Sequence, residues 1–368
     1  MSIPTNVLLD MQAVSQRAAS WQFDLLDQGR QVVRENLPID RDQVPTISVD
    51  TSRAIKRTLT GLRFNPGLLE TIDIIKNRLK VTMVLGDGTT WPQGIFMFSD
   101  VSAVVVSSGL LVPALNCVDQ LQIVDQALDY TVAYGPGKVI TDALRELLTE
   151  LPIEFSITPS GASISAAQEA VAWPAGTSRL RIINELATMI GYHELFFDNH
   201  GIAQLHPMPN PDSIDEGLMI DYPAGGRTYL GMTSLSTNLL DLPNRFIVVN
   251  TGASQVTVFG VYDVPASAAH SYENRGFRRT HVEQVQGIET NAEAVTAARA
   301  LARSWRFPFE TIEFSGPPDP RHDHYNVLNH EETRYFEMGW SMLCVDGSAM
   351  RHTARRTYEA EPGEVLEL

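Results

Sequence analysis

The feature that most constrains the fold is the density of short β segments in the first third of the chain. Between Trp21 and Val118 the sequence holds about eight such segments, rich in β-branched and aromatic residues and separated by turns. Asp87-Gly88 is the clearest turn, because this dipeptide favours the tight turn of a hairpin. Many short strands with frequent turns are typical of a β-barrel or sandwich, which we predict for residues 21–124. The predicted strands are Trp21–Leu26, Gln31–Glu35, Ile47–Asp50, Ala54–Leu59, Leu79–Leu85, Gly94–Asp100, Val101–Val106 and Val112–Val118.

Helical periodicity replaces this pattern in the middle of the chain. Apolar residues recur at helical spacing between residues 140 and 151, with acidic residues on the opposite face. A second helix is expected to begin at Thr177 or Ser178, either of which can cap it. Strand-like segments surround both helices. We therefore predict a small α+β domain over residues 125–212.

Strand-like segments return after residue 212 and continue almost to the end, with Arg245–Asn250 among the strongest. One helix interrupts them over residues 291–306, since Thr290 and Glu293 form a capping-box pattern at its start. We predict a second β domain over residues 213–358 that contains this inserted helix.

The two ends differ from the domains between them. Residues 1–20 are expected to form an N-terminal arm or short helix, and residues 359–368 an acidic tail. A length of 368 residues fits two to four domains. The whole pattern predicts a β-rich α+β multidomain protein, with modules in the order β, α+β, β.

Composition excludes several classes of protein. The chain has 28 Lys and Arg against 44 Asp and Glu, a net charge of −16, which argues against clamping nucleic acid or lying on an anionic membrane. The longest apolar stretch is broken by glycine and proline, so we expect no membrane anchor. The only cysteines, Cys117 and Cys344, lie in apolar strand-like sequence and are expected to be buried thiols of a protein made in the cytoplasm.

One cluster of candidate metal ligands occurs towards the C-terminus. His322 and His324 lie two residues apart, and His330, Glu331 and Glu332 follow. Imidazole and carboxylate groups suit zinc and other transition metals. The alternative is a solvated polar loop, because the cluster follows Gly-Pro-Pro-Asp-Pro and nothing orients the later residues to complete a ligand shell. We favour the loop and predict no metal site.

No motif indicates catalysis or cofactor binding. Residues 134–138, Tyr-Gly-Pro-Gly-Lys, precede a predicted helix and suggest a phosphate-binding loop. The first glycine of that motif is missing, since Val132 stands in its place, and Val139 stands where Ser or Thr would bind the magnesium ion. The sequence therefore predicts a protein that is not an enzyme, with no catalytic residues and no cofactor.

Three stretches carry more distinctive motifs. The first covers residues 48–66 and 77–100, where an Arg-Thr-Leu strand leads to a hairpin marked by Gly88, Pro92, Gly94 and Phe96. The second, residues 174–209, has the order helix, Gly-Tyr, strand, Asp-x-x-Gly turn, strand. The third, residues 239–252 and 273–302, has an Asn-Arg strand followed by an Arg-Gly turn and a helix.

Together, and in this order, the three stretches resemble the baseplate-hub, or tail-tip, minor tail proteins of long-tailed bacteriophages. The resemblance covers most of the chain after residue 20. It implies a homotrimer around a central channel, in which each subunit contributes two β-barrel hub domains that flank the small α+β domain. Three chains would then present six similar modules, so that a threefold tip can dock on a sixfold tail tube.

The implied role is that of a structural virion protein at the tail tip, which closes the distal end of the tube around the DNA-ejection channel. The implied partners are the tail tube or distal tail protein, the tape-measure protein, and a tip or fibre protein. DNA would pass without specific binding, and acidic residues in the lumen would repel its phosphates.

Two other functions stay open at this point. The first is a metal-dependent cell-wall hydrolase that uses His322, His324 and His330. The second is a carbohydrate-binding tail protein, which would need exposed aromatic side chains on one barrel face. Trp91 and Trp340, the aromatic residues considered for such a face, are expected in the core instead.

Overall fold

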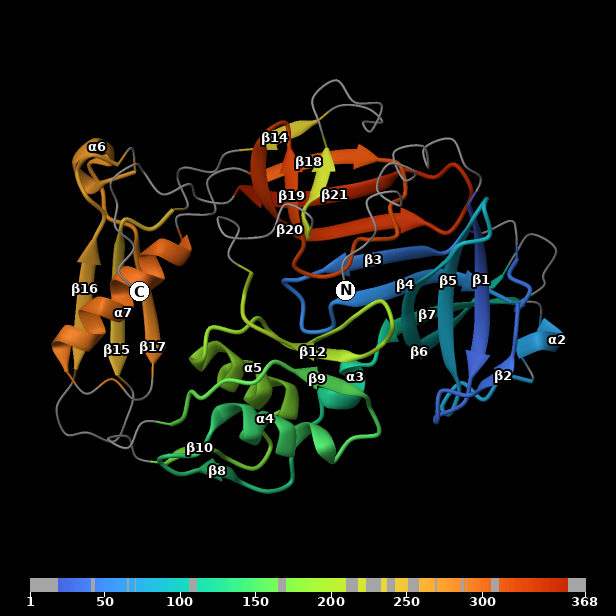
Figure 1. Ribbon diagram of the computed structural model, residues 1–368, viewed down its shortest axis with the longest axis horizontal. Helices are drawn as coiled ribbons and strands as arrows, with labels where there is room; N and C mark the ends of the chain where they lie inside the picture. The colour runs from blue at the N-terminus through green and yellow to red at the C-terminus, as the bar shows by residue number, and fades with distance from the viewer. Residues whose placement is uncertain are drawn as a thin grey trace.

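The computed structural model describes residues 19–356 apart from 41–43, 65, 70, 106–110, 165–169, 210–217, 223–232, 237–241, 251–257, 269, 286–287, 289 and 306–310. Its largest element is a 13-stranded sheet, which three smaller sheets accompany (Figure 1). Most of the predicted N-terminal arm and the whole acidic tail, residues 359–368, lie outside the described residues. None of the helices within the described ranges has the length and apolarity needed to cross a membrane.

Strands from the N-terminal third form one end of the large sheet, in the order β3-β4-β7-β6-β5-β1-β2. The predicted Asp87-Gly88 hairpin joins β5 to β6, and Gly88 takes the left-handed φ of 85° that the tight turn needs. The predicted strands Gly94–Asp100 and Val101–Val106 belong to one long strand, β6. A register shift between Phe98 and Asp100 bends this strand. The elements are β1 (Ala19–Leu26), β2 (Val32–Arg34), β3 (Thr46–Asp50), β4 (Arg57–Arg63), α2 (Pro66–Leu69), β5 (Arg78–Leu85), β6 (Thr90–Val105) and β7 (Leu111–Asp119).

Strands from the C-terminal third continue the same sheet. Along one edge the long strand β20 pairs with β21; along the other edge it pairs first with β19 and then with β3. The two strands β3 and β20 thus join the N-terminal and C-terminal β regions, drawn blue and red in Figure 1. The C-terminal elements are β13 (Ile220–Tyr222), β14 (Ser234–Ser236), β18 (Thr311–Gly316), β19 (Val327–His330), β20 (Thr333–Leu343) and β21 (Met350–Arg356).

A bulge between Glu337 and Gly339 marks the point where β20 exchanges one partner for the other. Because the extra residue shifts the alternation of the strand, Glu337 before it and Trp340 after it are both buried. A Cβ atom on Gly339 would lie 2.5 Å from the carbonyl oxygen of Val49, so the close approach of β3 requires glycine here.

The large sheet is an open path from β14 to β2 in the described residues. The β-rich class is confirmed, but the strand pairs of the described ranges close no barrel. Instead, the pairing of β3 with β20 places strands of both predicted β domains in one sheet. The two-barrel arrangement and the boundaries 21–124, 125–212 and 213–358 stay predictions.

The middle of the chain has a hydrophobic core of its own, to which both predicted helices contribute. The second helix begins as expected, with the Ser178 hydroxyl accepting a hydrogen bond from the amide of Arg181 at 3.4 Å. Two small sheets accompany the helices, β10-β8 and β11-β12-β9. The elements are α3 (Leu121–Val124), β8 (Val132–Tyr134), α4 (Ile140–Thr149), β9 (Phe155–Ile157), β10 (Val171–Trp173), α5 (Arg179–Met189), β11 (Phe196–Phe197) and β12 (Ala203–Leu205).

A fourth unit lies beside these, drawn orange in Figure 1. We call it the β15–β17 module: β15 (Arg245–Asn250), β16 (Phe259–Asp263), α6 (Tyr272–Arg275), β17 (Thr280–Val285) and α7 (Asn291–Trp305). The predicted capping box is formed, since Thr290 and Glu293 each accept a hydrogen bond from the other's amide. Within the described ranges its three strands pair only with one another.

Helix α7 packs on one face of the module's sheet, and a Cβ atom on Gly260 would lie 2.1 Å from the carbonyl carbon of Ala294. The module buries Phe246 and Val248 against this helix. It therefore has a core separate from that of the large sheet.

Candidate functional site

The loop between β18 and β19 contains the histidines that the sequence singled out. We call residues 317–326 the junction loop, because they contact the N-terminal β region, the C-terminal β region and the middle region. His322 is 0% exposed and His324 is 5% exposed. The predicted solvated polar loop is therefore wrong for these two histidines, since both are shielded from water.

Asp323 connects the junction loop to the two other regions. One of its carboxylate oxygens accepts a hydrogen bond at 2.6 Å from Arg57 of β4. The other accepts a hydrogen bond at 3.0 Å from the backbone amide of Asn199, which lies between β11 and β12. The Asn199 side chain in turn donates to the carbonyl oxygen of His322 at 2.9 Å. One carboxylate thus joins three regions that are far apart in the sequence.

Arg57 is the cation of this junction, and its side chain is 1% exposed. Besides Asp323, its guanidinium donates to the carbonyl oxygen of Gln93 at 2.9 Å. Burial alone would raise the pKa of Asp323, but the charge of Arg57, helped by His324 and the Asn199 amide, lowers that pKa below its usual value. The pair therefore joins a buried partner to a partly exposed one, since the Arg57 side chain is 1% exposed and the Asp323 side chain is 23% exposed.

His324 and Tyr325 face the middle region. The ring of His324 lies 4.7 Å from that of Phe196, and Tyr325 stacks on His193 at 4.9 Å between ring centroids. Burial lowers the pKa of His324 to about 4, so its ring is neutral near pH 7. This part of the junction is an aromatic contact between uncharged rings.

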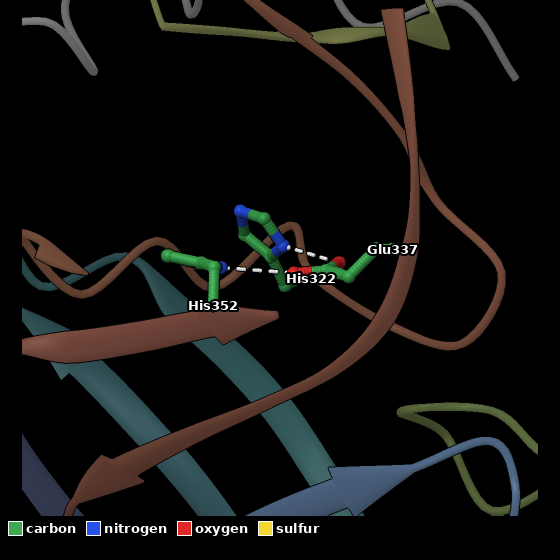
Figure 2. A group of neighbouring side chains, drawn as sticks. All are labelled: His322, Glu337 and His352. Atoms are coloured by element: carbon green, nitrogen blue, oxygen red, sulfur yellow. Dashed lines mark hydrogen bonds and ion pairs between the residues drawn. The ribbon is translucent and has the colours of Figure 1, made fainter. Parts of the chain in front are cut away.

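On the other side of the junction loop, His322 belongs to a closed group of four side chains that we call the His–Glu–His cluster: His322, Glu337 of β20, His352 of β21 and Tyr222 of β13. The Nδ1 atoms of His322 and His352 lie 2.7 Å and 2.8 Å from the two oxygens of Glu337. Dashed lines mark these two contacts in Figure 2. Their Nε2 atoms lie 2.8 Å and 3.3 Å from the hydroxyl oxygen of Tyr222. The carboxylate and the hydroxyl thus each bridge both rings.

Burial of this cluster is almost complete, since the three side chains drawn in Figure 2 are 0–1% exposed. Burial raises the pKa of Glu337 to about 7 and lowers the pKa of His322 to about 4. It also lowers the pKa of His352. In the protein alone, burial therefore favours the uncharged forms of all three groups.

The structure does not bring the predicted metal ligands together. His330 of β19 lies against Phe314 instead, with 4.9 Å between ring centroids, while Glu331 and Glu332 are exposed at the turn that follows. His322, Glu337 and His352 do converge, with one ligand atom from each lying within 4.8 Å of the others. Of the five predicted residues, only His322 belongs to the convergent set.

Sequence reasoning missed Glu337 and His352 because strand register and a bulge bring them to His322. Both residues carry a recognisable signal, however. Each is a polar residue at a buried position in the alternating burial pattern of its strand, and such positions are occupied by polar groups only when partners satisfy them.

Comparisons with known proteins identify the fold. No protein-family model matches the sequence, and no curated protein matches it by sequence. The tail protein from Neisseria meningitidis MC58 superposes with a TM-score of 0.64 at 12% identity, covering 92% of this chain and 97% of its own. The 43 kDa tail protein of prophage MuSo2 from Shewanella oneidensis gives 0.60 at 11% identity, covering 92% and 98%. Prophage tail protein gp18 from Listeria monocytogenes EGD-e gives 0.54 at 10% identity, covering 92% and 95%.

Each likeness spans nearly the whole of both chains, so it concerns the arrangement of all the regions described above. At 10–12% identity it establishes the fold and not the activity. The chain has the fold of phage tail proteins, as its sequence motifs predicted.

Proposed function

We propose that this chain is a structural subunit of a phage tail tip, in which three copies form a hub that closes the distal end of the tail tube. The observation that carries the proposal is the match of the whole chain to tail proteins of similar length. A fold shared from end to end leaves little of the chain for an added catalytic domain, which supports a structural role.

The junction supports this role because a hub subunit has to hold its parts in a fixed relation. Backbone hydrogen bonds between β3 and β20 join the two β regions directly. The Arg57–Asp323 pair and the Asn199 amide add the middle region to the same unit. A subunit joined in this way resists bending between its β regions when neighbouring rings dock on it.

The finer parts of the proposal follow from the family resemblance. Each subunit would supply two similar β modules, so that three copies match the sixfold tube. The neighbours would be the tube or distal tail protein on one side, the tape-measure protein inside, and a tip or fibre protein on the other side. We place the protein in the virion, at the tail tip.

The net charge of −16 suits a channel for DNA. An acidic lumen repels phosphate, so the genome passes during ejection without binding. The predicted absence of enzymatic activity belongs to the same proposal. The hydrolase alternative gains no support from the geometry, because His322, His324 and His330 enter three different environments.

Electron cryo-microscopy of tails that carry a tagged copy of this chain tests the proposal. We expect three tagged copies around the tail axis at the distal end of the tube. A single copy per tip, or copies placed off the axis, would contradict a trimeric hub. Tails assembled without the chain are the control for the density assigned to it.

A further inference from the structure

We propose that His322, Glu337 and His352 form a buried structural site for a divalent transition-metal ion of the zinc class, with Tyr222 orienting both imidazole rings. The ligands come from the junction loop, β20 and β21, so the ion would fasten the loop to the C-terminal part of the large sheet. This inference does not depend on the proposed function.

The donor atoms have the spacing that such an ion needs. Two Nδ1 atoms and two carboxylate oxygens converge, with nitrogen–oxygen distances of 2.7 Å and 2.8 Å. One ligand atom from each of the three residues lies within 4.8 Å of the others. Two ligand atoms that are each about 2.1 Å from one tetrahedral ion lie about 3.4 Å apart, which falls between the nitrogen–oxygen contacts and this outer limit. Two imidazole nitrogens and a bidentate carboxylate would therefore supply four donors to one ion.

Tyr222 contributes the second argument. Its hydroxyl oxygen lies 2.8 Å from Nε2 of His322 and 3.3 Å from Nε2 of His352. Histidine ligands of metals almost always donate the hydrogen of their other ring nitrogen to a fixed acceptor. One hydroxyl oxygen can accept from both rings, and it then fixes both in the tautomer whose Nδ1 lone pair faces Glu337.

A count of hydrogens gives the third argument. The four contacts within the cluster need one hydrogen each when no ion is bound. An ionised Glu337, two neutral imidazoles and the Tyr222 hydroxyl supply only three. A cation between the Nδ1 atoms and the carboxylate takes the place of the hydrogens in those two contacts, and the two Nε2–H groups then supply the remaining two hydrogens to Tyr222.

The charges around the cluster agree with this. Asp319 pairs with Arg321 at 2.5 Å, and Asp323 pairs with Arg57 at 2.6 Å. In each pair the charge of the arginine offsets that of the aspartate. Glu337 has no Lys or Arg as an ion-pair partner in the described ranges, and its two oxygens meet only imidazoles. It is the buried carboxylate at the junction for which the chain supplies no permanent cation.

The donor set selects the class of ion. Imidazole nitrogen with carboxylate oxygen suits Zn²⁺ and its neighbours, whereas Ca²⁺ and Mg²⁺ prefer oxygen alone and Cu⁺ prefers sulfur. With side chains 0–1% exposed, the site leaves no open position for substrate. The role of the ion is therefore structural, in contrast to the metal-dependent cell-wall hydrolase considered from the sequence.

The test uses the full chain without a histidine tag, stripped with a chelator and titrated with zinc chloride. We expect one zinc ion per chain by elemental analysis of the desalted protein, and a higher melting temperature with zinc than with chelator. His352→Ala and Glu337→Gln should each abolish the bound zinc and the rise in melting temperature. His324→Ala is the matched control, because it removes a buried histidine next to the site and should leave the stoichiometry unchanged.

Cobalt binding to the wild-type chain keeps the test valid should a variant fail to fold. We expect the visible absorption bands of cobalt in a low-coordinate nitrogen and oxygen site, which zinc then displaces. A folded wild-type chain that takes up neither ion, or zinc uptake that persists in folded His352→Ala, overturns the proposal. In that case Glu337 holds the fourth hydrogen of the cluster.

Discussion

The junction and the β15–β17 module are built on opposite plans. At the junction, Arg57 and the His–Glu–His cluster are buried, and Asp323 accepts hydrogen bonds from two other regions of the chain. The module has one covered face and one that α7 does not cover, where Phe259 is 51% exposed and Val282 is 54% exposed. The junction is held by contacts between regions of one chain, whereas the module leaves apolar side chains exposed on one face.

This difference separates two tasks of the proposed hub subunit. A contact that fixes the shape of the subunit must be complete before assembly and gains from burial. Exposed apolar side chains that lie close together on a monomer mark surfaces for interaction. We therefore expect substitutions at the junction to act on folding, and substitutions on the open face of the module to act on assembly.

The largest effect is expected for Arg57→Ala. The substitution leaves the Asp323 carboxylate, which is 23% exposed, without its cation. Breaking a fully buried ion pair costs roughly 3–5 kcal/mol, and the partial exposure of Asp323 places the expected loss at about 3 kcal/mol, the lower end of that range. Urea unfolding of the full chain measures this loss. Arg53→Ala is the control, because Arg53 pairs with Asp50 at a side-chain exposure of 69% and should change stability by about 0–1 kcal/mol. Equal losses for the two variants would refute the special role of the junction.

The next effect depends on pH and concerns Asp119, which accepts a hydrogen bond from the Arg57 amide. Burial raises the pKa of Asp119 to about 6, above its usual 3.8. The folded state then binds the proton more tightly than the unfolded state, so this residue's contribution to stability falls as pH rises between about 4 and 6.

Unfolding curves of the wild type and Asp119→Asn at a series of pH values test this sign. The wild type should lose stability relative to the variant by at most about 3 kcal/mol across that range. Parallel pH profiles for the two proteins would mean that Asp119 is already ionised throughout.

Two glycines, Gly339 in the large sheet and Gly260 in the β15–β17 module, allow a matched comparison of these two regions. An added methyl would meet the Val49 oxygen at 2.5 Å in Gly339→Ala and the Ala294 backbone at 2.1 Å in Gly260→Ala. Overpacking of this kind costs typically about 1–3 kcal/mol. Hydrogen exchange should show Gly339→Ala weakening the whole large sheet, and Gly260→Ala weakening the module alone.

Gly135→Ala controls for this pair, since open space surrounds the added methyl there. A uniform loss of protection in Gly260→Ala would show that the module is not a separate unit of stability.

The smallest effect on folding is expected for the double variant Phe259→Ser and Val282→Ser. Both side chains are half exposed, so stability should change by only about 0.5 kcal/mol. Incorporation of the variant into tails, measured by competition with the wild type, should fall clearly. Val32→Ser and Val33→Ser, at the exposed edge strand β2, are the control for a general change in surface polarity. Unchanged incorporation of the module variant would remove the open face from the assembly surface.

The parts of the fold that were predicted from sequence depend on contacts between near neighbours. The Asp87-Gly88 turn, the Ser178 cap and the Thr290–Glu293 capping box each involve residues no more than three positions apart. A short window of sequence contains all the residues that form each of these contacts, so the hairpin turn and the two helix starts were predicted correctly.

The candidate site escaped prediction because its contacts are distant in sequence. Arg57 of β4 and Asp323 of the junction loop are separated by 266 positions, and the pairing of β3 with β20 joins the two β regions to which they belong. The junction loop looked solvated because its proline-rich start and its charges are typical of loops. Burial was decided by partners such as Asn199 and Glu337, which no local pattern connects to it.

The pairing of β3 with β20 also limits when the large sheet can form during synthesis. During synthesis β3 leaves the ribosome about 290 residues before its partner β20. The backbone edge of β3 that pairs with β20 therefore stays unpaired until most of the chain has been made. Pairings so remote in sequence form slowly, and a bare strand edge invites other chains to pair with it. Yield in the host is thus expected to depend on chaperones that shield the nascent N-terminal third until the last strands leave the ribosome.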